Sequence, residues 1–137
     1  MSAQLAEALN AAMNARDIER FVELFHEDYD SKQPAHPDRA FVGRHPVRKN
    51  WSSIFEGVPD FHSELIRVAE DGDTVWSEWH WQGTHTDGTP LDMAGVIVFG
   101  VRDGRIGWAR LFVEPVEQEG AGIDAAVGEI SGRDPSG

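Results

Sequence analysis

The chain has 137 residues, of which 40% are hydrophobic, and this is enough for one compact domain around a single core. Its formal net charge of −12 argues against nucleic-acid binding and against an anionic membrane surface, because both need clustered Lys and Arg. The absence of cysteine excludes disulfides, thiolate metal sites and a cysteine nucleophile, and no apolar run approaches the ~20 residues of a membrane span. We therefore expect a soluble, cytoplasmic protein.

Two amphipathic helices are predicted at the N-terminus. Apolar side chains recur at helical spacing in residues 2–15, and Ser2 stands where an N-cap is favoured. Asp17 can cap the second helix. The buried face of this second helix would consist of Ile18, Phe21, Val22 and Phe25.

A short strand and a loop are predicted to follow these helices. Tyr29, Ser31 and Gln33 alternate with polar residues as one side of a strand, and Pro34 ends it because proline cannot donate to a strand ladder. We expect a loop over residues 36–42.

A third helix and a long antiparallel sheet complete the predicted domain. Pro46 is favoured in the first helical turn, and Gly57 followed by Pro59 would end that helix. Three Asp-Gly dipeptides can supply the positive φ of tight hairpin turns, which predicts a four-stranded meander. Its strands would span residues 61–70, 74–85, 91–101 and 105–113.

The C-terminal residues differ in composition from the rest of the chain. Residues 1–116 read as one domain, whereas residues 117–137 are Gly-rich and polar, with few side chains to bury. We expect this tail to be loose or to pack on a neighbouring molecule.

The central predicted strand carries large apolar side chains on both of its faces. Trp79 and Trp81 point to one face and Trp76 to the other, because successive side chains of a strand alternate. Helices would cover the first face. The second face of the sheet would carry an apolar patch too large to stay in contact with water, so we expect a homodimer through this outer face.

The order of elements and several short motifs resemble the SnoaL-like branch of the nuclear transport factor 2-like superfamily. The motifs are Asn14-Ala-Arg-Asp17, Phe25-His-Glu-Asp28, Gly83-Thr-His85 and Asp103-Gly-Arg-Ile106. The resemblance covers residues 3–116 and implies an α+β fold in which a cone-shaped, curled antiparallel sheet is capped by three N-terminal helices (the cystatin-like α+β barrel). It also implies a cavity inside the cone.

The resemblance further implies where catalytic groups would lie. Ketosteroid isomerases, limonene-epoxide hydrolases and SnoaL-type aldol cyclases of this superfamily use inward-facing acidic, tyrosine or arginine side chains. In this chain the matching positions hold no acid and are Leu9, Gln33, Trp79, Trp81, Gly95 and Leu111. General acid–base chemistry would therefore need other residues.

Three residues are candidates for a catalytic role. His36 lies in the loop at the expected cavity mouth and could act as a general base, although a histidine in such a loop is more often simply solvated. Tyr29 and Gln33 could orient a carbonyl or hydroxyl group of a ligand, although a tyrosine at such a position is often only packing.

Six further residues are candidates for ligand contacts. Tryptophans in the cone would give flat apolar walls suited to aromatic ligands, although they could also be plain core. A histidine at a strand end could instead hydrogen-bond its own turn. The candidates are Trp51, Phe55, Trp79, Trp81, His85 and Met93.

The sequence thus predicts a protein that binds a small hydrophobic or aromatic molecule in the cone, and leaves open whether a cyclase, isomerase or hydrolase reaction follows. The alternative is a non-catalytic dimerisation or scaffold module whose cone is filled by aromatic side chains. We expect no cofactor, and no metal, because Glu78 and His80 would need a third ligand from elsewhere.

Overall fold

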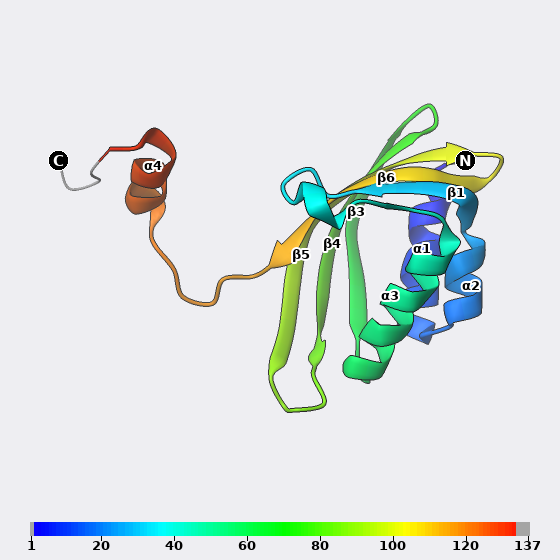
Figure 1. The fold of residues 1–137 in the computed structure, drawn as a ribbon, viewed down its shortest axis with the longest axis horizontal. Helices are drawn as coiled ribbons and strands as arrows, with labels where there is room; N and C mark the ends of the chain where they lie inside the picture. The colour runs from blue at the N-terminus through cyan, green and yellow to red at the C-terminus, as the bar shows by residue number, and fades with distance from the viewer. Residues whose placement is uncertain (1, 134–137) are drawn as a thin grey trace.

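A curled six-stranded sheet packs against three helices in the computed structural model, which describes residues 2–133 (Figure 1). The strand order is β2-β1-β6-β5-β4-β3. The helices are α1 (Gln4–Ala15), α2 (Ile18–Glu23), the short 3₁₀ helix η1 (Pro37–Arg39), α3 (Arg44–Gly57) and α4 (Ile123–Ser131). The strands are β1 (Phe25–Lys32), β2 (Phe41–Val42), β3 (His62–Asp71), β4 (Thr74–Thr84), β5 (Pro90–Arg102) and β6 (Arg105–Pro115).

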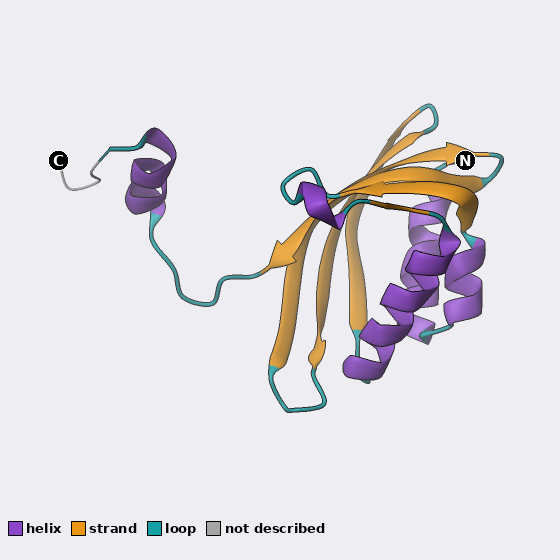
Figure 2. Ribbon diagram, in the orientation of Figure 1, coloured by secondary structure: helices purple, strands orange, loops and turns teal. Residues whose placement is uncertain are grey.

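The predicted α+β fold is confirmed, with α1, α2 and α3 on the same side of the curled sheet (Figure 2). The sheet is mixed rather than wholly antiparallel, because β1 pairs parallel to β6. Hairpin turns force β3 to β6 to alternate in direction. In contrast, α3 and four strands separate β1 from β6 in the chain, so β1 is free to run parallel to β6. The sheet does not close, and β2 and β3 are its edges.

The helix ends agree only in part with the sequence pattern. Asp17 caps α2 as predicted, since its Oδ1 accepts a hydrogen bond from the backbone N–H of Arg20 at 3.1 Å. The prediction for Ser2 was wrong, because Ala3 occupies the N-cap of α1 without a side-chain hydrogen bond. The second helix was also predicted too long. Phe25 begins β1 instead, although its ring still packs on Phe21 with centroids 5.2 Å apart.

The hairpins agree closely with the sequence pattern. Gly72, Gly88 and Gly104 adopt φ values of 60°, 90° and 74°, which confirms the Asp-Gly turns. The register that follows pairs Trp81 with Met93 across β4 and β5, and both side chains face the helices. The predicted division of β4 into an inner and an outer face is therefore confirmed.

The C-terminal tail contains a helix that the sequence pattern did not predict. Residues 116–122 lead away from the end of β6, and α4 lies apart from the sheet and the other helices (Figure 1). The apolar side chains of α4 face solvent, with Ile123, Val127 and Ile130 being 76%, 50% and 87% exposed. None of the helices between residues 2 and 133 is long and apolar enough to cross a membrane.

We predict that deletion of residues 117–137 leaves the stability of the remaining domain unchanged. The exposed side chains of α4 bury little area against the body, so the free energy of unfolding should change by less than about 0.5 kcal/mol. Urea unfolding of the full chain and of residues 1–116 measures this difference. A marked loss of stability in the truncated chain would mean that the tail packs on the domain or on a neighbour.

Candidate functional site

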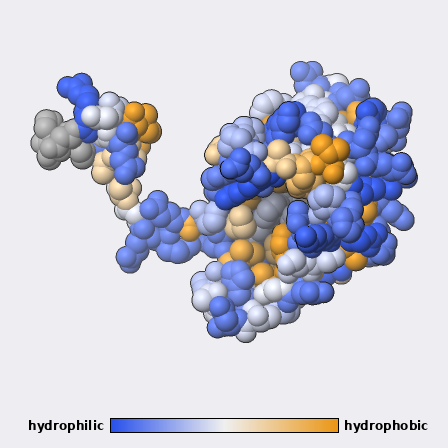
Figure 3. Space-filling model, viewed as in Figure 1, coloured by the Kyte–Doolittle hydropathy of each residue, from blue (hydrophilic) through white to orange (hydrophobic). Residues whose placement is uncertain are grey.

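A cavity of about 420 Å³ lies between the inner face of the sheet and the helices. Side chains from α1, α2, β1, η1, β2, α3, β4, β5 and β6 line it. Figure 3 shows a hollow in the surface of the domain with apolar side chains gathered around it. This volume falls within the range of pockets that hold small organic molecules, roughly 300–1,000 Å³.

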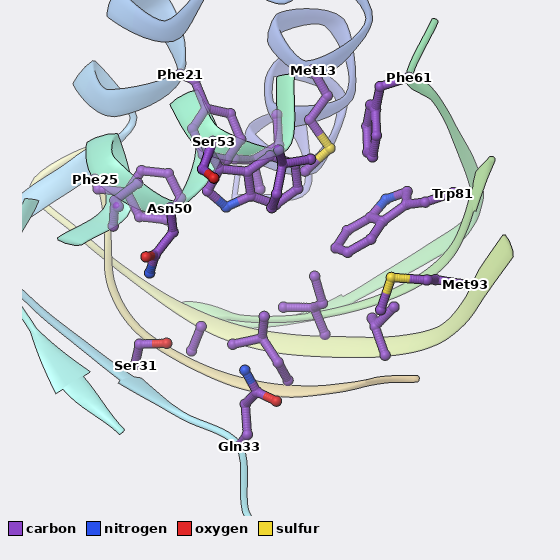
Figure 4. A pocket seen from close by; sticks show the side chains of 18 of the residues that line it. Met13, Phe21, Phe25, Ser31, Gln33, Asn50, Ser53, Phe61, Trp81 and Met93 are labelled. Carbon is purple, nitrogen blue, oxygen red and sulfur yellow. The ribbon is translucent and has the colours of Figure 1, made fainter. Parts of the chain in front are cut away.

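Aromatic rings form one wall of the cavity. Trp51 of α3 meets Trp81 of β4 edge to face, with ring centroids 5.3 Å apart, and meets Phe61 in the same way at 5.7 Å. Met93 lies beside Trp81 (Figure 4). Such rings and thioethers offer broad apolar contact to a flat ligand.

Polar side chains border the cavity mainly from β1, η1 and α3. In Figure 4, Ser31, Gln33 and Asn50 lie across the cavity from Trp81 and Met93. No Asp or Glu is among the described residues that line the cavity. The polar lining residues are Tyr29, Ser31, Gln33, Arg39, Asn50, Ser53 and His85.

Tyr29 lies on the inner face of β1 and is almost fully buried. Burial raises the pKa of its phenol to about 12, and a hydrogen bond with the Ser31 side chain opposes part of this effect. The ring meets Phe25 edge to face at a centroid distance of 4.7 Å. At neutral pH the phenol is therefore a hydrogen-bond donor and not a base.

Gln33 and Arg39 are held together where β1 leads into η1. The guanidinium Nη1 of Arg39 donates a hydrogen bond to Oε1 of Gln33 at 3.0 Å. Figure 4 shows the Gln33 side chain pointing into the cavity. Because its oxygen is engaged by Arg39, the amide NH₂ of Gln33 is the group left for a ligand.

His85 lines the cavity and also ties the turn between β4 and β5. Its Nδ1 lies 2.9 Å from the carbonyl oxygen of Thr89. A carbonyl can only accept, so Nδ1 carries the proton and Nε2 of the neutral ring is left as an acceptor. His85 thus hydrogen-bonds its own turn, as the alternative interpretation expected, and also lines the cavity.

Three predicted site residues do not line the cavity. Nε2 of His36 lies 2.6 Å from Oε1 of Glu114 on β6, so the loop histidine is engaged by a carboxylate outside the lining. Phe55 packs on Trp51 behind the wall, with ring centroids 5.7 Å apart. Trp79 is fully buried in the core. The other six predicted residues are in the lining: Tyr29, Gln33, Trp51, Trp81, His85 and Met93.

Two small residues of the central strands, Gly95 and Ser77, have structural roles. Gly95 has φ of 157°, and a Cβ built there would lie 2.1 Å from the carbonyl oxygen of Phe112. Its lack of a side chain therefore permits the close approach of β5 to β6. Ser77 is buried, donates to the carbonyl of Ile97 at 2.8 Å, and accepts from Nε1 of Trp79 at 2.7 Å.

Three polar residues that line the cavity were not predicted from the sequence. Asn50 and Ser53 lie three residues apart on α3 and border the same cavity. Asn50 occupies the i+3 position of the apolar stripe that starts at Val47. A polar residue on this inward face of the helix could have been predicted to border the cavity. Arg39 had no comparable signal, because its place depends on the conformation of the loop around η1.

Comparison with protein families matches the SnoaL-like domain to residues 6–108 of the chain. A search of curated protein sequences found no match. Among solved structures, the chain is similar to IdmH of Streptomyces antibioticus, a protein assigned as a polyketide cyclase. The two share 22% sequence identity with a TM-score of 0.73, over 83% of this chain and 92% of IdmH.

Two other solved structures show the same fold. An LEH-like epoxide hydrolase of M. tuberculosis is 18% identical, with a TM-score of 0.71 over 82% of each chain. A protein of Kribbella flavida assigned as a ketosteroid isomerase is 21% identical, with a TM-score of 0.69 over 88% of this chain and 83% of that one. At these identities the likeness establishes the fold and leaves the chemistry to be argued from the residues.

We predict that the phenol of Tyr29 titrates with a pKa near 12 in the folded protein. Its folded pKa is raised above the unfolded value of about 10, so the stability that it contributes is complete below pH ~10 and is lost as the pH rises towards 12. The chain has a single tyrosine, so absorbance at a phenolate band reads this group alone. An apparent pKa of about 10 in the folded chain would contradict the burial of this ring.

Proposed function

The chain belongs to the SnoaL-like domain family, and from its cavity we propose that it binds a small hydrophobic or aromatic molecule. The open volume of about 420 Å³ beside the aromatic wall carries this proposal. The alternative scaffold function needs a cone filled by Trp51, Trp79 and Trp81. Only Trp79 is wholly within the core, whereas Trp51 and Trp81 border the open space, and this favours ligand binding.

A reaction in this cavity would have to use an unusual set of groups. The relatives assigned as a cyclase, an isomerase and an epoxide hydrolase share the fold, and we propose that any turnover here is a cofactor-independent step of that kind. With no carboxylate in the described lining, Nε2 of His85 is the acceptor available as a base. The buried phenol of Tyr29 is one donor that could polarise a carbonyl.

We predict that filling the cavity abolishes binding of a neutral aromatic probe. Ala109 is a buried lining residue on β6, and Ala109→Leu adds bulk into the open space. The neutral naphthalene dye prodan, followed by fluorescence titration, should bind this variant at least about tenfold more weakly than the unmodified chain, which corresponds to roughly 1.4 kcal/mol.

The matched control is Ala69→Leu, which makes the same change at an exposed position of the edge strand β3. This variant should bind prodan like the unmodified chain. Circular dichroism of both variants checks that the fold is retained. Absence of saturable binding by the unmodified chain, or equal binding by the two variants, would refute the cavity as the binding site.

We also propose that the chain forms a homodimer through the outer face of the sheet. Trp76 and Phe112 are 53% and 43% exposed there, on strands separated by β5. They border a shallow groove with Val98, Trp108 and Arg110, and the Arg110 guanidinium lies over the Trp108 ring at 5.2 Å. A second copy would remove these apolar surfaces from water.

We predict that Trp76→Glu dissociates this dimer. The substitution places a charge in the middle of the apolar face, where pairing would bury it without a partner. Sedimentation equilibrium should show a dimer for the unmodified chain and a monomer for the variant at the same concentration. Ile130→Glu, at an exposed apolar position on α4, is the control and should stay dimeric. A monomeric unmodified chain would contradict the proposal.

A further inference from the structure

The charge of the cavity lining differs from that of the whole protein. The chain carries 24 Asp and Glu and a formal net charge of −12, yet none of these carboxylates is among the described lining residues. Arg39 supplies a permanent positive charge there. The long-range field of the protein disfavours anions, so attraction of an anion would have to come from this local arrangement.

Arg39 is placed to use its guanidinium at the cavity rim. It ends η1, and its backbone N–H donates to the carbonyl oxygen of His36 at 3.0 Å. Of the five N–H donors of the guanidinium, one is bonded to Oε1 of Gln33 in the described structure. The guanidinium therefore keeps free N–H donors, and their planar arrangement matches the two oxygens of a carboxylate. The hydrogen bond to Gln33 restrains the motion of the guanidinium.

The donors near Arg39 lie across the cavity from two of its large apolar side chains, Trp81 and Met93. Gln33 offers its amide NH₂ beside Arg39, and Asn50 borders the same side from α3 (Figure 4). Trp81 and Met93 lie across from them. A ligand that satisfies both sides has a flat apolar body and one acidic end.

From this layout we propose that the natural ligand is an aromatic or polycyclic carboxylic acid. Its ring system would lie against the wall formed by Trp51 and Trp81, and its carboxylate would accept hydrogen bonds from Arg39 and Gln33. The inference rests on the proposed binding function and adds the chemical class of the ligand. It also gives Arg39 the role of a specificity-determining residue.

The test compares two probes of the same shape that differ in charge, 2-naphthoate and neutral 2-naphthamide. Isothermal titration of the unmodified chain at low salt should give about tenfold tighter binding of naphthoate, as expected for one charge-assisted hydrogen-bonded pair. The preference should shrink at high salt, because Arg39 is solvent-exposed and its field is screened.

Arg39→Gln should remove the preference for naphthoate and leave the affinity for naphthamide unchanged. Arg39→Lys should keep part of it, because a lysine retains the charge without the planar fork. The matched control is Arg105→Gln, which changes the net charge equally at an exposed position in the hairpin between β5 and β6. This control should bind both probes like the unmodified chain.

The outcomes separate this inference from the binding function on which it rests. Equal affinity of the unmodified chain for naphthoate and naphthamide would overturn the acid specificity while leaving hydrophobic binding intact. An equal loss in Arg39→Gln and Arg105→Gln would show a general effect of net charge and would also overturn it. If neither probe binds, and prodan does not bind either, the proposed function itself fails and the inference with it.

Discussion

The fully buried indole of Trp79 is the constraint on which the inner face of the sheet depends. A buried indole N–H without an acceptor costs about 1–3 kcal/mol, and here Ser77, two residues earlier on β4, accepts it. Ser77 in turn donates to the carbonyl of Ile97 on β5. This chain of hydrogen bonds joins the two central strands and satisfies the buried side-chain polar groups of Trp79 and Ser77.

The residue opposite Trp79 explains why the cavity lacks a familiar catalytic group. Trp79 pairs with Gly95, and Gly95 has no room for a side chain because β6 approaches it at the Phe112 carbonyl. The second acid of an isomerase-like site would fall near this position, so the close strand packing excludes it. The next inward residue on β4, Trp81, borders the cavity. The packing of β5 against β6 thus leaves no room for any side chain at this position.

Local patterns predicted much of the fold, and tertiary contacts determined the rest. Period-two alternation and the Asp-Gly turns gave the four long strands and their two faces, because both signals act within a few residues. The same alternation could not separate Trp79 from Trp81, which share a face but differ in depth. Nor could it show that His36 meets Glu114, a partner 78 residues away, because that contact forms only when the loop packs on β6.

The alternation of side chains also separates the two apolar surfaces of the sheet. On β4, Trp79 and Trp81 face inward while Trp76 and Glu78 face outward, and β5 and β6 follow the same rule. A change at an inward position can therefore alter the cavity without touching the outer groove, and an outward change can alter the groove alone. The two faces are coupled only where a substitution would change the spacing between paired strands, as at Gly95. Apart from such positions, the cavity and the outer groove can vary independently on the same strands.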